Sequence, residues 1–134
     1  DVTEDSIVDN KRVLSLIDHT RRQGRIARAL LDGAYDTYKT WNGLSARAIK
    51  PLILLRKNAV VNYYKSRVRS KAIKICTDFA MQWPTASGYG QRWQAETWFS
   101  SYKRRFGECC TATKPENVIK EILLKAMLCN QLIV

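Results

Sequence analysis

The spacing of hydrophobic and polar positions divides the first half of the chain into helix-like and strand-like segments. In residues 9–19, polar cap candidates precede apolar residues at helical spacing, which predicts an amphipathic helix that ends before Gly24. The apolar runs of residues 25–31 and 49–58 predict two buried strands, and residues 35–48 between them predict a broken helix. Alternating helices and strands indicate an α/β fold with a parallel sheet.

The second half of the chain predicts helices only. Residues 59–83 have a helical and basic pattern, residues 84–90 predict a loop, and residues 89–106 and 115–132 predict two more helices. Proline at position 115 suits the first turn of the last of these. The expected inner stripe of residues 59–83 consists of Val61, Tyr64, Val68, Ile75 and Phe79. The last helix carries Ile119, Ile122, Leu123, Ala126 and Met127 along one side.

The first residues fit this scheme poorly. Residues 1–6 are partly strand-like but have no turn, cap or partner strand beside them. Because two further strands alone make a marginal sheet, we expect the sequence to begin in the middle of a domain.

The composition is that of a soluble globular protein, with 46% hydrophobic and 26% charged residues. No apolar run approaches the roughly 18 residues of a membrane span, and the acidic N-terminus does not resemble a signal peptide. The four cysteines lack C-x-x-C spacing and the single histidine is His19, which argues against a zinc site and a disulfide framework. We expect free thiols in the cytosol.

The charge is strongly positive and unevenly distributed. The formal net charge is +11, and residues 39–74 contain many Lys and Arg residues but no Asp or Glu. Such a block can be a solvated helix face, but in so basic a chain we favour a polyanionic partner, DNA or RNA, because phosphate contacts release counterions.

A polar stripe in residues 89–103 is the first candidate for chemistry. On a helix, Tyr89, Arg92, Glu96, Ser100 and Lys103 share one face. One interpretation is a surface ion pair between Arg92 and Glu96, worth about 0.3–0.5 kcal/mol, beside a solvated Lys103. Several aromatic residues in the same segment favour a helix that packs against other structure instead.

The second candidate is Asp32, which follows the predicted strand of residues 25–31. A carboxylate at the carboxyl end of a buried strand is rigidly held, and Gly33 allows a sharp turn beside it. The alternative is that Asp32 and Gly33 form only a turn.

These two motifs resemble those of a known family. The spacing Y-x2-R-x3-E-x6-K resembles the Tyr-Arg-Glu-Lys signature of insertion-sequence transposases of the DDE type, and "LLDGAYD" resembles the segment that supplies their middle catalytic aspartate. Similar stretches, "VTEDSIVDNKRV", "IKPLILLRKNA", "YGQRWQAETWFSSYKRRFGE" and "ENVIKEILLKAMLCNQLI", follow the family's order over most of the chain. Two carboxylate motifs in the right order are harder to obtain by chance than either alone.

The resemblance implies a partial RNase H-like fold with an incomplete sheet. Residues 1–134 would be a single partial catalytic domain that lacks the first strands, with a basic helical and loop insertion at 59–88. It implies DNA strand cleavage and strand transfer by three carboxylates that hold two Mg²⁺ (or Mn²⁺) ions. Asp32 and Glu96 would be catalytic residues and metal ligands.

The resemblance also implies DNA, as transposon ends and target, as the partner, in a prokaryotic cytoplasm at the nucleoid. Arg92 and Lys103 would bind scissile-strand phosphates, and Tyr89 would position the DNA end. The residues expected to add non-specific backbone contacts are Arg56, Lys57, Lys65, Arg67 and Arg69. No membrane association is expected, and a homodimer of the intact transposase stays open.

The match departs from the family at its first aspartate, which lies upstream of the segment that residues 1–6 resemble. None of Asp1, Glu4, Asp5 and Asp9 is assigned that role, so we expect this chain alone to be inactive. A fragment, a decayed reading frame and a split gene stay open. Two rival functions remain: a non-catalytic basic α/β module that binds nucleic acid, and a helical interaction protein whose charge maintains solubility.

Overall fold

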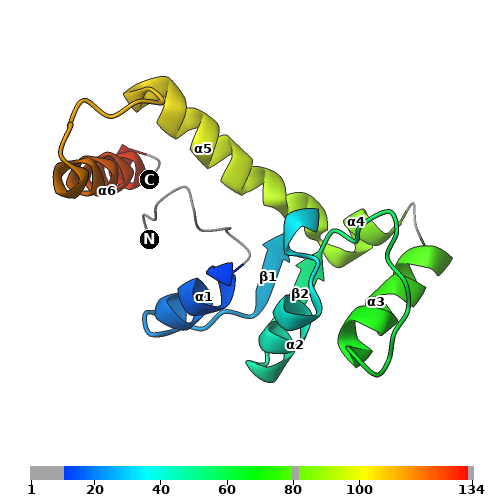
Figure 1. The fold of residues 1–134 in the computed structure, drawn as a ribbon. Coiled ribbons are helices and arrows are strands. Elements are labelled where there is room, and N and C mark those ends of the chain that lie inside the picture. Colours follow the sequence, from blue (N-terminus) through cyan, green and yellow to red (C-terminus); the bar gives the residue numbers. More distant parts are fainter. Residues whose placement is uncertain (1–10, 80–81, 133–134) are drawn as a thin grey trace. The chain divides into compact units, whose positions relative to one another are not determined.

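The computed structural model describes residues 11–79 and 82–132 (Figure 1). They form two compact units, of which the first ends at Gln91 and the second begins at Arg92. In chain order the elements are α1 (Val13–Arg21), β1 (Arg28–Leu31), the 3₁₀ helix η2 (Gly33–Tyr35), α2 (Tyr38–Ala46), β2 (Lys50–Ile53), α3 (Arg67–Asp78), α4 (Trp83–Ser87), the 3₁₀ helix η3 (Tyr89–Arg92), α5 (Trp93–Phe106) and α6 (Pro115–Leu132).

A parallel pair of strands lies at the centre of the first unit. Strands β1 and β2 pair with Arg28 opposite Lys50 and Leu31 opposite Ile53, and α2 connects them. The chain is therefore a helix-rich α/β protein. Both predicted strands are present but shorter, and no residue of β1 is fully buried. Lys50 N–H donates to Ala27 O and Leu54 N–H to Leu31 O, so alternate residues of β2 direct their backbone nitrogens toward β1. Pro51 falls between them, at a position whose nitrogen points away from β1 and carries no hydrogen.

The core of the first unit lies where α1 and α2 pack against β2. Its buried residues are Val13, Ile17, Trp41, Leu44, Ile49 and Ile53. Helix α1 agrees with the predicted amphipathic helix within the described residues, whereas Asp9 lies outside them.

The predicted break in residues 35–48 is wrong, because α2 runs unbroken through Gly43. Thr37 caps its start by accepting the N–H of Thr40. A Cβ at Gly43 would lie 2.5 Å from Cδ1 of Leu14. Glycine thus serves a close approach between α1 and α2 rather than a turn.

The predicted helix over residues 59–83 is shorter in the structure. Helix α3 begins only at Arg67, where Ser66 caps it by accepting the N–H of Arg69. Of the expected inner stripe, Val68 packs against the core, whereas Val61 and Tyr64 are exposed and precede α3, and Ile75 and Phe79 are exposed. The buried residues of α3 are Arg69, Ser70 and Ile73, so the inward side of the helix carries a charged residue beside apolar ones.

Residues 84–90 were predicted as a loop but are largely helical. Helix α4 ends at Gly88, which adopts the left-handed conformation at φ 75°. The following η3 places the ring of Tyr89 5.4 Å from that of Trp83, centre to centre.

The second unit consists of α5 and α6, and the predicted bounds of α6 are confirmed. The indole N–H of Trp98 on α5 donates to Oδ1 of Asn130 on α6 at 2.9 Å. Among the described residues of this unit, only Cys129 is buried. All four cysteines are free thiols, as predicted. No helix in the described ranges is both long and apolar enough to cross a membrane.

Candidate metal centre and nucleic-acid interface

Asp32 directly follows the carboxyl end of strand β1, as predicted. Its Oδ1 accepts the N–H of Ala34 at 2.8 Å and thereby caps η2, so the interpretation of Asp32 as a turn residue also holds.

The turn that carries Asp32 is held by Arg56 from the loop after β2. The Arg56 guanidinium donates from Nε to Gly33 O at 3.0 Å and from Nη2 to Ala34 O at 3.4 Å. The backbone N–H of Arg56 donates to Oδ2 of Asp36 at 3.2 Å. Arg56, which the sequence placed at DNA phosphates, thus contacts the chain's own backbone.

Behind this turn lies a buried ion pair between Asp36 and Arg69. Arg69 donates from Nε to Oδ1 of Asp36 at 2.7 Å and from Nη2 to Oδ2 at 2.8 Å. Arg69 is 7% exposed and Asp36 is 5% exposed. The indole N–H of Trp41 also donates to Oδ1, at 2.8 Å. Burial alone would raise the pKa of Asp36, but the hydrogen bonds from Arg69, Trp41 and the Arg56 backbone outweigh it and lower that pKa from its ordinary value.

Arg69 is therefore separate from the exposed basic surface. Its guanidinium is fixed by Asp36 and lies 5.0 Å from the centre of the Tyr38 ring. The sequence placed Arg69 at the DNA and did not identify Asp36 at all. No local pattern links two residues that lie 33 positions apart.

Tyr89 lies close to the end of β1. Its hydroxyl donates to Leu31 O at 3.1 Å, and the same carbonyl accepts the N–H of Leu54 at 3.1 Å. The first residue of the predicted signature is thereby hydrogen-bonded to the peptide bond that joins Leu31 to Asp32.

Exposed cations surround the start of α3 in the first unit. Lys57, Lys65 and Arg67 are exposed, and so are Lys71 and Lys74 farther along α3. Lys65 and Lys74 lie over tyrosine rings, at 5.4 Å from the centre of Tyr38 and of Tyr63 respectively. This arrangement offers several positive charges to a polyanion.

Glu96 lies in the first turn of α5 in the second unit. It forms an i, i+4 ion pair of 2.7 Å with Arg92, and its side chain is 61% exposed. Lys103 pairs with Glu108 at 3.0 Å. The surface ion pair is therefore present. Helix α5 also packs against α6 through Trp98 and Asn130, although none of its residues is fully buried.

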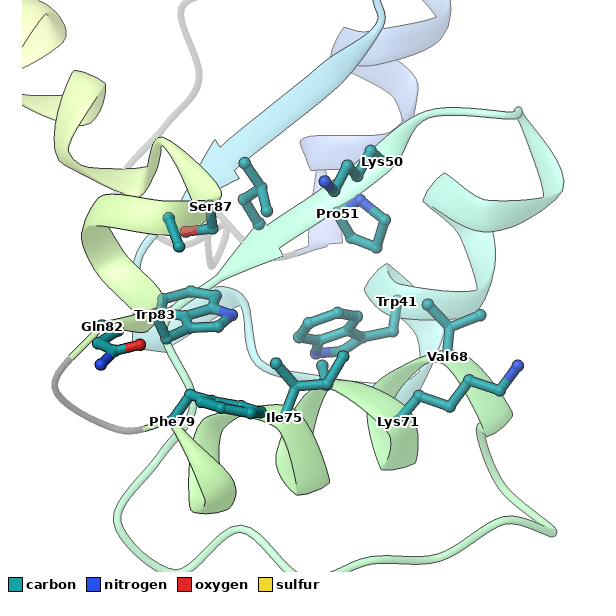
Figure 2. Close-up of a pocket in the computed structure, with 13 residues that line it drawn as sticks. Trp41, Lys50, Pro51, Val68, Lys71, Ile75, Phe79, Gln82, Trp83 and Ser87 are labelled. Atoms are coloured by element: carbon teal, nitrogen blue, oxygen red, sulfur yellow. The ribbon is translucent and has the colours of Figure 1, made fainter.

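A cavity of about 500 Å³ lies between β2, α3 and α4 (Figure 2). Trp41 and Trp83 stand on opposite sides of it, and Phe79 and Ile75 line its α3 side (Figure 2). Two lysines, Lys50 and Lys71, are its charged lining residues. No local sequence signal predicts this cavity, because its lining residues come from four separate segments.

The residue types of the candidate site suit a hard divalent cation, because Mg²⁺ and Mn²⁺ prefer carboxylate oxygens. Asp32 belongs to the first unit and Glu96 to the second, and each unit is described by itself. Within the described ranges, no group of three His, Cys, Asp or Glu side chains is assembled to hold a metal ion.

Residues 1–131 match the family model described as the transposase DDE domain. The match spans nearly the whole chain and includes both candidate carboxylates. No solved structure matches the chain.

Proposed function

This chain belongs to the transposase DDE domain family, and on that premise we propose that Asp32 and Glu96 are two of the carboxylates that hold divalent cations at a DNA phosphodiester. Membership in this family supports transposition, which is phosphoryl transfer on DNA, as the function. The observation that carries the assignment is the position of Asp32 directly after the parallel strand β1, in a family whose chemistry depends on carboxylates.

The residues divide into two roles. Asp32 and Glu96 supply hard oxygen ligands for Mg²⁺ or Mn²⁺. When bound, such ions activate the attacking oxygen and stabilise the charge on the phosphate. The chain itself contributes a fixed carboxylate at the end of β1 and a second one in the first turn of α5.

The proposed DNA-contacting residues are those with exposed charge. Lys57, Lys65 and Arg67 are exposed in the first unit, and Arg92 and Lys103 accompany Glu96 in the second. Such contacts with phosphates give affinity without sequence choice. We leave Arg69 out of this set, because its guanidinium is buried against Asp36.

The finer assignments are part of the same proposal. We assign the Tyr-Arg-Glu-Lys subtype on Tyr89, Arg92, Glu96 and Lys103. We also propose that β1 and β2 belong to an RNase H-like sheet within a single partial domain at 1–134, in which residues 59–88 are a basic insertion. The parallel pairing of β1 and β2 around the crossover α2 supports this arrangement.

The proposal is tested by replacing the natural cation with Fe²⁺. With ascorbate and peroxide, bound Fe²⁺ generates hydroxyl radicals that cut the backbone close to the ion. We expect cuts near both residue 32 and residue 96, both suppressed by excess Mg²⁺, and both weakened by Asp32→Asn or by Glu96→Gln. Asp78→Asn, which alters an exposed carboxylate at the end of α3, is the matched control and should leave the pattern unchanged.

The rival function is a non-catalytic basic module that binds nucleic acid. The cap formed by Asp32 and the exposed pair of Glu96 with Arg92 are the observations in its favour. It predicts DNA binding that is independent of divalent cations and no localised cuts at either carboxylate. That outcome would exclude the metal-dependent function.

A further inference from the structure

All three carbonyl oxygens around Asp32 are hydrogen-bonded. Leu31 O accepts from the Tyr89 hydroxyl and the Leu54 N–H, and Asp32 O accepts from Tyr35 N–H at 3.1 Å. Gly33 O accepts from Nε of Arg56 at 3.0 Å. Tyr89 thus binds the peptide group before Asp32, and Arg56 binds the peptide group between Gly33 and Ala34, one step farther along the turn.

Arg56 is itself fixed from the interior of the first unit. Its backbone N–H donates to Asp36, whose carboxylate is held by the fork of Arg69 and by the indole of Trp41. This buried pair gives the Asp32 turn a rigid support that extends to α2 and α3.

We propose that Tyr89 and Arg56 are positioning residues that orient the Asp32 carboxylate toward a divalent cation, and that their main contribution is not contact with DNA. The inference rests on the proposed function of Asp32 as a metal ligand. The Asp32 carboxylate is oriented by its bond from the Ala34 N–H and by the backbone of the turn. Tyr89 holds that turn at the Leu31 carbonyl, and Arg56 holds it at the Gly33 and Ala34 carbonyls. Loss of such an outer partner typically weakens metal affinity by about 10- to 100-fold.

Two conservative variants separate positioning from DNA contact. Tyr89→Phe removes only the hydroxyl and keeps the ring that packs beside Trp83. Arg56→Lys keeps the positive charge that attracts phosphate but loses the guanidinium fork that spans Gly33 O and Ala34 O. Tyr63→Phe is the matched control, since Tyr63 is exposed on the loop before α3.

The experiment measures two affinities on the full 134-residue chain. The dissociation constant for Mn²⁺ is obtained from the electron paramagnetic resonance signal of free Mn²⁺, and metal-free binding to a labelled duplex is obtained from fluorescence anisotropy. We expect Tyr89→Phe and Arg56→Lys each to raise the Mn²⁺ dissociation constant about tenfold and to change duplex affinity by less than about twofold. Tyr63→Phe should change neither, and a melting curve for each variant reports on folding.

The possible failures are distinguishable. If Tyr89→Phe and Arg56→Lys lower duplex affinity and leave Mn²⁺ affinity at the wild-type value, the positioning role is overturned and both residues are DNA contacts. If wild-type Mn²⁺ binding is insensitive to Asp32→Asn, the proposed function itself fails, and this inference fails with it. If Arg56→Lys does not fold, the result for Tyr89→Phe decides.

Discussion

Asp36 forms a buried ion pair with Arg69, which belongs to the basic segment of residues 39–74. Arg69 is thereby buried, whereas Arg67 and Lys71 on the same helix α3 are exposed. A buried pair is costly to desolvate, so its members depend strongly on each other. Removing one partner should therefore lower the free energy of unfolding more than replacing both partners together.

Removing one partner should destabilise the first unit severely. Asp36→Ala leaves the Arg69 guanidinium buried without its carboxylate, and we expect a loss of about 3–5 kcal/mol in the free energy of unfolding. Urea denaturation followed by tryptophan fluorescence measures this. Asp78→Ala, at an exposed site on α3, should stay within about 0.5 kcal/mol of wild type.

Replacing both partners by apolar residues should restore much of that loss. In Asp36→Leu/Arg69→Met no charge remains buried, so the double variant should be more stable than Asp36→Ala or Arg69→Met alone. If the loss in the double variant equals the sum of the losses in Asp36→Leu alone and Arg69→Met alone, the two side chains contribute independently.

The stability of the second unit should depend on the ionisation of Glu121. Its carboxylate accepts from Lys125 and from the backbone N–H groups of Ala112 and Thr111, which lowers its pKa to about 2. Because the folded pKa lies below the unfolded value, the stabilisation is complete above about pH 4.5 and is lost as the pH falls toward 2.

A pH series of urea denaturation measures this effect. The stability difference between wild type and Glu121→Gln should shrink over that pH range. A difference that stays constant down to about pH 2 would show that the Glu121 carboxylate has no depressed pKa in the fold.

At the scale of elements, local sequence signals predicted the ends of helices and strands where neighbouring residues determine them. Strand β1 ends where Asp32 and Gly33 stop the apolar run, and α6 begins at Pro115 as expected. The sequence-based prediction was wrong where contacts between distant residues determine the structure. The pattern predicted a broken helix over residues 35–48, although α2 is continuous through Gly43, which accommodates Leu14.

Gly43 provides a test of this close approach between α1 and α2. Gly43→Ala places a methyl group against Leu14 and should destabilise the protein by about 1–3 kcal/mol, although alanine favours helices. In a Leu14→Ala background, where the space is open, the same Gly43→Ala change should instead stabilise by about 0.5–1 kcal/mol. Thermal melts of the four proteins in this cycle measure both effects.

Gly24 serves as the control, because nothing lies within 4 Å of a Cβ placed there. Gly24→Ala should be neutral or slightly stabilising. If Gly43→Ala has the same sign in both backgrounds, Leu14 does not contact this position as described.

At the scale of the whole molecule, the two units differ in how much they bury. The first has a core built from α1, α2 and β2, whereas in the described part of the second unit only Cys129 is buried. We therefore expect the amides of α5 and α6 to exchange with solvent faster than those of α2, β1 and β2 in hydrogen-exchange mass spectrometry. Equal protection in both units would indicate a single cooperative fold.

The net charge of +11 should govern DNA affinity through salt. Replacing Lys57, Lys65 and Arg67 together by alanine should lower the slope of log affinity against log salt by about 0.9 for each lost phosphate contact. Fluorescence anisotropy over a salt series measures this slope. Lys120→Ala, on α6, should leave it unchanged, and an equal effect of both changes would indicate binding by diffuse charge.

The candidate site was predictable only as separate pieces. The sequence located Asp32 at a strand end because the preceding apolar run and the following glycine are local signals. It could not find the bond between Tyr89 and Leu31, whose partners lie 58 positions apart. It also grouped Arg69 with its exposed neighbours, since charge patterning does not distinguish a solvated arginine from one that satisfies a buried aspartate.

The imino acid at position 51 has a consequence for self-association. A strand can pair with another strand when it offers a regular row of backbone N–H donors along its side. Pro51 removes one such donor from the side of β2 that faces away from β1. Cross-β stacking of neighbouring molecules through that side is therefore hindered. Pro51→Val would supply the missing donor and should make the protein more prone to form fibrils, which thioflavin fluorescence would report.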